Sequence, residues 1–284
     1  MFSYFKGINY RKLAKDIIFR IQDDDVSALA SQLAYSLLLS FFPFLIFLLT
    51  LVGYSPVSTQ QVIVTLNKIF PEEVYTLVDK IVTEVFAHKS GGLLSFGVIV
   101  MVVVSSNGFG AVMKGLNKAY DEDERRSFIR RELVSIICTF GIALILIFSI
   151  ILLVFGETNG RMISMHLNLG IKFSIIWNGF RYIVMLLVMS YIFALLYRFT
   201  PSRRLTLREV YPGAIFTTIG WVIASQLFSF YIENFANYSK VYGSIGAVII
   251  MLTWLFIISI ILLIGGEINA AIVHQKKLIL FRID

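Results

Sequence analysis

Six long apolar stretches dominate the sequence, and they constrain the fold more than any other feature. Each holds about 20 residues with almost no charge, which is the length that an α-helix needs to cross the hydrocarbon core of a bilayer. The stretches are continuously apolar, without the alternation that the strands of an outer-membrane barrel show. We therefore expect an all-α integral membrane protein with spans at about residues 28–54, 93–113, 133–155, 174–196, 211–233 and 244–266.

The composition of the chain excludes the soluble classes of protein. Hydrophobic residues make up 57% of the 284 residues, charged residues make up 15%, and the mean hydropathy is +0.80. Soluble domains carry about 25% charged residues, enough to cover their surface. The single cysteine, Cys138, lies inside the third predicted span, so no disulfide can form within the chain.

The distribution of Lys and Arg predicts the orientation of the spans. Eighteen of the 25 Lys and Arg residues fall in the N-terminal segment, in the connections after the second and fourth spans, and in the C-terminal tail. Basic residues are enriched on the cytoplasmic side, so we expect both termini in the cytoplasm and the spans in a bacterial inner membrane. The net charge of +7 then reflects topology, and no specific nucleic-acid partner is expected. The chain divides into a cytoplasmic segment (1–27), a six-helix domain (28–273) and a cytoplasmic tail (274–284).

Two other segments have the pattern of amphipathic helices but are too polar to span a membrane. Residues 10–21 place leucine and isoleucine on one face between basic residues, which is typical of a helix lying on the inner membrane surface. Residues 71–88 begin with Pro-Glu-Glu, a favourable helix start, and then repeat apolar residues at helical spacing. We expect this second helix on the outer side, where it either packs against the bundle or moves as a lid.

Polar side chains at membrane depth are the first candidates for function, because they are costly to place there. Four of them lie on four different spans: Gln32, Asn107, Gln226 and Glu267. We hypothesise that these side chains line a polar cavity open to the cytoplasm. The alternative is that they occupy tight helix contacts, which the small residues after Asn107 would also allow.

Charged residues near the ends of the spans form a second group of candidates. Lys114 is predicted at the depth of Glu267, so the two can form an ion pair that ties two helix ends together. Arg181 lies one or two turns inside the outer end of the fourth span. There it can contact Glu233 or a lipid phosphate, or extend to the membrane surface.

No catalytic or metal-binding set is recognisable in the sequence. His88 and His166 are predicted outside the membrane and His274 inside, so the three histidines cannot meet at one metal ion. Neither a Gly-rich phosphate-binding loop nor a Ser–His or Cys–His pairing is evident. We therefore expect no metal and no cofactor, and we do not expect an enzyme.

Three motifs, taken in order, resemble the YihY/BrkB family of bacterial inner-membrane proteins. The motifs are ALASQLAY at residues 28–35 with Phe-Pro at 42–43, GLNKAY at 115–120 with RRSF at 125–128, and YGSIGA at 242–247 with GGEINA at 265–270. The family usually carries Gly-Ala-Glu in its last span, where this chain has Gly265-Gly266-Glu267.

The resemblance implies a six-helix inner-membrane protein. Members have carried the label ribonuclease BN, and the roles proposed for them concern envelope integrity and the movement of lipids or lipid precursors. We therefore predict a protein that transports or redistributes a lipid-like or amphiphilic substrate for envelope maintenance. Its expected partners are membrane lipids, with a second copy of the chain or an envelope protein as a further candidate. A ribonuclease and a non-catalytic membrane scaffold are the alternatives.

Overall fold

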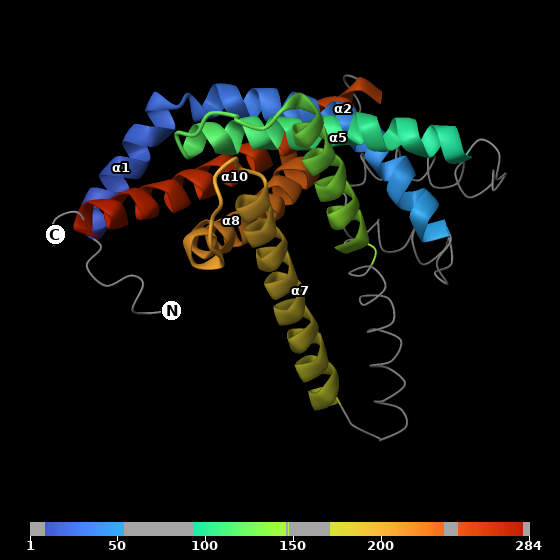
Figure 1. Ribbon diagram of the computed structural model, residues 1–284. Helices are drawn as coiled ribbons and strands as arrows, with labels where there is room; N and C mark the ends of the chain where they lie inside the picture. Colours follow the sequence, from blue (N-terminus) through green and yellow to red (C-terminus); the bar gives the residue numbers. More distant parts are fainter. Residues whose placement is uncertain (1–8, 54–93, 146, 148–170, 236–243, 281–284) are drawn as a thin grey trace.

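The computed structural model describes residues 9–53, 94–145, 147, 171–235 and 244–280, and all regular secondary structure in this part is helical (Figure 1). The described helices are α1 (Tyr10–Asp23), α2 (Val26–Gly53), α5 (Leu94–Ala119), a helix over residues 128–145, α7 (Ile171–Phe199), α8 (Leu207–Phe235) and α10 (Ser244–Leu280).

The apolar stretches of the sequence coincide with these helices. Helices α2, α5, α7, α8 and α10 each cover one predicted span, and the third predicted span is helical as far as residue 145. Its remainder, and the predicted outer helix at 71–88, lie outside the described residues. Within the described part, four segments are long and apolar enough to cross a membrane: Val26–Phe47, Tyr182–Phe199, Leu207–Ile232 and Val248–Leu278.

The apolar surface of these helices faces outward. Tyr182 and Leu187 on α7, and Ile223 and Leu227 on α8, are each more than half exposed. A protein surrounded by water does not present contiguous apolar helix faces of this size. The exposed faces therefore suit a surface covered by lipid, and helix α7 extends away from the other helices in Figure 1.

Helix α1 forms where the amphipathic pattern predicts it, over two residues more. The Asn9 side chain begins it by accepting hydrogen bonds from the backbone N–H groups of Arg11 and Lys12. Its apolar side chains divide between two surroundings: Ile21 packs against the core at the bundle, whereas Ile18 and Phe19 stay exposed. Exposed apolar side chains on a basic helix suit a membrane surface, and that placement of α1 stays a prediction.

Helix α10 is longer than the sixth predicted span, which ends at residue 266. It continues to Leu280 because residues 267–280 contain no glycine or proline and include good helix formers. This extension packs along α1, and the start of α1 lies beside the end of α10 in Figure 1. Much of the segment assigned to the C-terminal tail is therefore helical and continuous with the last span.

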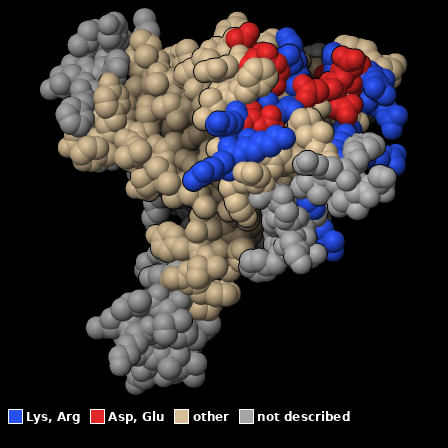
Figure 2. All heavy atoms as spheres, turned by 90° about the vertical axis from the view of Figure 1, so that its left-hand side faces the viewer, with Lys and Arg blue, Asp and Glu red and all other residues tan. Residues whose placement is uncertain are grey.

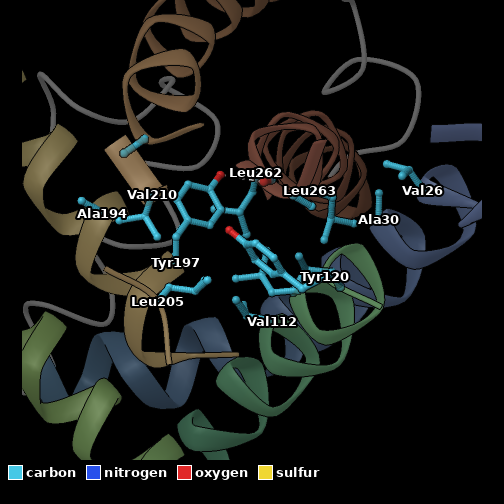
Figure 3. Close-up of a cluster of buried hydrophobic side chains, with 14 residues drawn as sticks. Val26, Ala30, Val112, Tyr120, Ala194, Tyr197, Leu205, Val210, Leu262 and Leu263 are labelled. Atoms are coloured by element: carbon cyan, nitrogen blue, oxygen red, sulfur yellow. Dashed lines mark hydrogen bonds between the residues drawn. The ribbon is translucent and has the colours of Figure 1, made fainter. Parts of the chain in front are cut away.

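The main hydrophobic core lies where α2, α5, α7, α8 and α10 meet (Figure 3). Tyr197 of α7 is fully buried in it, and its hydroxyl donates to the carbonyl oxygen of Leu262 on α10 at 2.6 Å. The Tyr197 hydroxyl also lies 2.6 Å from Oγ1 of Thr217 on α8, which can then donate to it. A buried tyrosine thus joins three helices through satisfied hydrogen bonds.

Helices α8 and α10 cross at glycines. A Cβ atom on Gly213 of α8 would overlap the carbonyl oxygen of Gly265 on α10, and a Cβ on Gly265 would overlap the hydroxyls of Thr217 and Tyr197. The backbone N–H of Gly213 donates to Oδ1 of the buried Asn269 at 2.7 Å. Small residues therefore allow the two backbones to approach closely, as in other membrane helix pairs.

Charged side chains gather at one end of the molecule. Figure 2 shows Lys, Arg, Asp and Glu side chains of both signs interleaved over one part of the face, while the remaining described surface is largely uncharged. The charged end includes α1, the end of α5 and the connections that follow α5 and α7, and the candidate site lies there.

Candidate functional site

A groove of about 620 Å³ opens beside α2, α5 and the beginning of the helix at 128–145. Helix α2 contributes Gln32 and Ser36, and helix α5 contributes Asn107, Lys114 and Lys118. Its volume falls in the range of sites that bind small molecules, roughly 300–1,000 Å³. The α2–α5 groove is therefore large enough for the headgroup of an amphiphile.

The α2–α5 groove is lined by charged side chains of both signs and by apolar side chains. Lys114 Nζ donates to Oε1 of Gln32 at 3.1 Å across the groove. Ser106 Oγ lies 3.1 Å from Oε1 of Glu132, which joins α5 to the helix at 128–145. The charged lining residues are Lys114, Lys118, Arg131, Glu122, Asp123, Glu124 and Glu132, and the apolar ones include Leu29, Ala111 and Met113.

The structure brings together two of the four residues expected in a polar cavity. Gln32 and Asn107 both line the α2–α5 groove, and both are exposed. Gln226 is exposed on α8 and is not among the groove residues, whereas Glu267 is buried at 1% exposure within the bundle. Depth along the chain did not reveal which face of each helix carries the side chain.

The expected charged contacts near the span ends have different outcomes. Lys114 lines the groove and hydrogen-bonds Gln32, and Glu267 faces Asp24, Arg20 and Asp121. The side chains of Arg181 and Glu233 lie outside the described residues, so their pairing stays a prediction.

Glu267 belongs to an acid cluster, which we define as Asp16, Arg20, Asp24, Lys118, Asp121 and Glu267, and of these Asp24 and Glu267 are buried. Lys118 Nζ lies 3.1 Å from Oδ1 of Asp24, a residue only 4% exposed. Arg20 donates to Oδ2 of Asp121 at 3.1 Å and lies 3.8 Å from Asp16. The hydrogen bond that Lys118 donates to Asp24, followed by the negative charge of Asp24, raises the pKa of the Lys118 ammonium. The cluster ties the junction of α1 and α2 to the end of α5.

A second polar cluster joins the connections after α5 and α7. We call it the loop clamp, and it consists of Asn117, Glu124, Arg126, Thr200 and Ser202. Arg126 donates two parallel hydrogen bonds of 2.7 Å to the Glu124 carboxylate and one of 2.9 Å to the carbonyl oxygen of Thr200. Asn117 donates to Glu124 at 2.9 Å and accepts from the backbone N–H of Ser202 at 2.7 Å. Bidentate Arg–carboxylate pairs of this kind hold a fixed geometry.

The Glu124 carboxylate should give the protein a stability that depends on pH. Its hydrogen bonds from Arg126 lower its pKa from an ordinary 4.5 to about 2, against a smaller opposing effect of burial. Because the folded pKa lies below the unfolded one, the stabilisation is complete above about pH 5 and is lost as the pH falls towards 2. We expect the melting temperature of Glu124→Gln in detergent to lie below that of the unchanged protein near pH 7, and the difference to vanish near pH 2. A difference that stays constant down to pH 2 would contradict this assignment.

Sequence reasoning missed the clamp residues and Asp24. Asn117 and Arg126 do lie in the second of the motifs that carry the family resemblance, in its GLNKAY and RRSF parts. That position was the available signal, but it does not reveal that both side chains reach the connection near Ser202, which lies 85 positions from Asn117 in sequence. Within the described residues, no group of three or more His, Cys, Asp or Glu side chains is arranged to hold a metal ion.

The chain is similar to known proteins of one family. The family described as Virulence factor BrkB matches residues 17–279. A protein of Bacillus subtilis strain 168 named "Putative ribonuclease-like protein YfkH" is 42% identical over 264 residues, which cover 93% of this chain and 96% of that protein.

More distant relatives are named as membrane proteins. A UPF0761 membrane protein of Alteromonas mediterranea is 27% identical over 92% of this chain and 88% of its own length. One from Vibrio campbellii is 26% identical over 92% of this chain and 82% of its own length. No solved structure matches the chain.

Proposed function

Because the chain belongs to the Virulence factor BrkB family of membrane proteins, we propose that it moves or redistributes a lipid-like or amphiphilic substrate in the bacterial inner membrane. In this proposal the protein crosses the membrane six times with both termini in the cytoplasm. The α2–α5 groove holds the polar headgroup of the substrate. The movement of this substrate contributes to maintenance of the envelope. The observation that carries the proposal is the charged groove beside helix faces that expose apolar side chains.

One face of helix α2 carries both hydrogen-bonding and apolar side chains, which suit the two parts of an amphiphile. Gln32 and Ser36 line the groove, and Tyr35 and Leu39 lie on the same face of the helix because residues three, four and seven apart align. Tyr35 is 60% exposed and Leu39 is 55% exposed. The face therefore changes from hydrogen-bonding groups to apolar side chains within two turns, which suits a headgroup followed by an acyl chain.

Lys114 is the residue that best tests this function. Its ammonium group lies in the groove on Gln32, where it can donate to a phosphate or another anionic headgroup oxygen. We expect purified protein in vesicles to speed the movement of a fluorescent phospholipid between leaflets, measured by chemical quenching of the outer leaflet. Lys114→Ala should lower that rate about tenfold, because one charge-assisted hydrogen bond is lost.

A matched lysine outside the groove provides the control. Lys277 is exposed near the end of α10 and does not line the groove, so Lys277→Ala should leave the rate unchanged. Lipid movement no faster than in protein-free vesicles would overturn the proposal. Cleavage of labelled RNA by the same preparation, lost in a point variant, would favour the ribonuclease alternative instead.

A further inference from the structure

The charged side chains that line the α2–α5 groove do not all compensate one another. Two of them have ion-pair partners that do not line the groove: Lys118 at 3.1 Å and Glu124 at 2.7 Å. Within the described residues, no ion pair involves the Lys114 ammonium, and none involves the Glu132 carboxylate. The groove therefore offers groups of both signs that are open to a ligand.

The Glu132 carboxylate is only partly supplied with hydrogen-bond donors. It is half-buried near the beginning of the helix at 128–145, and its Oε1 lies 3.1 Å from Oγ of Ser106. Ser106 is fully buried, and its Oγ also lies 2.7 Å from the carbonyl oxygen of Val103. A serine hydroxyl carries one proton, and the shorter contact takes it. The Glu132 carboxylate therefore faces the groove with room for another donor.

Lys114 offers the opposite charge further along the same groove. Its Nζ donates to Oε1 of Gln32 at 3.1 Å, which engages one of the three N–H donors of the ammonium. Ser106 and Lys114 are two helical turns apart on α5, about 12 Å along the axis, and the flexible stem of Lys114 can cover part of this distance. Gly110 lies between them, and a Cβ on it would meet nothing within 4 Å, so the interval has room for a ligand.

The remaining charged residues of the lining are less suited to hold a ligand in a fixed position. Glu122 and Asp123 belong to the connection after α5 and not to a helix. The Arg131 guanidinium lies over the ring of Phe128, with Cζ 5.4 Å from the ring centroid. Glu132, by contrast, stands on a helix and contacts a buried residue, which makes it the acidic group best placed to bind a cation.

We propose that the α2–α5 groove selects a lipid headgroup with both a phosphate and a primary ammonium, as in phosphatidylethanolamine. Lys114 donates to a phosphate oxygen, and Glu132 accepts from the ammonium. The inference rests on the proposed function of the groove and names its substrate class. The acyl chains lie on the exposed face of Tyr35 and Leu39, at the side of the groove.

A headgroup that lacks the primary ammonium fits the groove less well. A purely anionic headgroup meets Lys114 but leaves the half-buried Glu132 carboxylate without a cation, which is unfavourable. A phosphocholine headgroup keeps the positive charge, but its quaternary nitrogen has no N–H group to donate to Glu132. The geometry therefore ranks phosphatidylethanolamine above both phosphatidylglycerol and phosphatidylcholine.

The test is a calorimetric titration of the full chain, in micelles of neutral detergent, with short-chain forms of these three phospholipids as probes. Phosphatidylethanolamine should bind about tenfold more tightly than phosphatidylglycerol, because it adds one charge-assisted hydrogen bond. Phosphatidylcholine should bind more weakly than phosphatidylethanolamine. Glycerophosphoethanolamine has the same headgroup without acyl chains and should also bind more weakly, and an equal affinity would overturn the lipid as the source of the headgroup.

Two variants separate the two halves of the headgroup. Glu132→Gln keeps the length of the side chain, and its amide can donate to Ser106, so it should lose only the preference for phosphatidylethanolamine. Unchanged binding of phosphatidylglycerol shows that this variant is folded. Lys114→Ala should weaken the binding of all three lipids by a similar factor, because they share the phosphate.

Asp25 provides the matched control for the loss of one negative charge. It is exposed, does not line the groove and has a φ of 48°, a conformation that Asn also adopts readily, so Asp25→Asn should keep the preference.

Three outcomes would overturn the selectivity and leave the proposed function standing. These are equal affinities for phosphatidylethanolamine and phosphatidylglycerol, a preference that persists in Glu132→Gln, and a preference that is lost in Glu122→Gln instead, which would place the ammonium at the connection after α5. Absence of saturable binding by any of the lipids, or binding unaffected by Lys114→Ala, would overturn both the selectivity and the proposed function.

Discussion

Gly213→Ala should destabilise the folded protein more than any other single methyl group added to a described glycine. The new Cβ would overlap the carbonyl oxygen of Gly265, and because both atoms belong to helix backbones, neither can rotate away. Separating α8 from α10 would also lengthen the 2.7 Å hydrogen bond from Gly213 to Asn269, which is fully buried. Overpacking and the weakened hydrogen bond together should lower the free energy of unfolding by about 3 kcal/mol or more.

Thermal unfolding in detergent, followed by intrinsic fluorescence, measures this effect, and two other glycines calibrate it. A Cβ on Gly266 meets the flexible end of Leu116 at 2.8 Å, which can move, so Gly266→Ala should cost little. A Cβ on Gly141 meets nothing within 4 Å, and Gly141→Ala should be neutral or slightly stabilising. Equal melting temperatures for the Gly213 and Gly266 variants would refute the close crossing.

Removal of the Arg126 guanidinium should have the second-largest effect on stability. Its side chain is 12% exposed and makes two hydrogen bonds to Glu124 and one to the carbonyl oxygen of Thr200. Arg126→Ala leaves the Glu124 carboxylate, which is 25% exposed, with Asn117 and Ser202 as its remaining side-chain donors. We expect a loss of about 2 kcal/mol, reduced from the cost for a fully buried pair by the exposure of Glu124.

A lysine at position 126 separates the contribution of the positive charge to stability from that of the hydrogen-bond geometry. Arg126→Lys keeps the positive charge but cannot form two parallel hydrogen bonds to the carboxylate while also reaching Thr200. Its melting temperature should therefore lie between those of Arg126→Ala and the unchanged protein. Limited proteolysis adds a second readout, because the connection near Ser202 should be cut faster when the clamp is lost. A lysine variant as stable as the unchanged protein would show that charge alone suffices.

Hydrophobic length was enough to predict where α2, α5, α7, α8 and α10 lie. The predicted spans and the helices agree because a run of about 20 apolar residues has one stable conformation in a bilayer, in which every backbone group bonds within the helix. Hydrophobic length did not predict that α10 continues past Gly266, where residues without glycine or proline extend the helix and its last turns pack along α1.

The candidate site could be predicted only in part for a related reason. Depth along a span follows from counting residues, and it placed Gln32 and Asn107 at the level of the groove. Whether a side chain faces a groove, lipid or the core depends on helix rotation, which packing determines. Rotation turned Gln226 outward on α8 and buried Glu267. The partners of Asp24 and Asn117 come from segments far apart in the chain, and a single sequence carries no record of those contacts.

The length of α10 connects the membrane interior to its surface. Its 37 residues form an unbroken helix of roughly 55 Å, whereas the hydrocarbon core of a bilayer is about 30 Å thick. The part of α10 that exceeds this thickness lies beside α1, where Nδ1 of His274 on α10 is 3.7 Å from Oδ2 of Asp16 on α1. Because α10 packs against α2, α5 and α8 in the bundle and against α1 beyond it, one continuous helix connects the core of the bundle to α1.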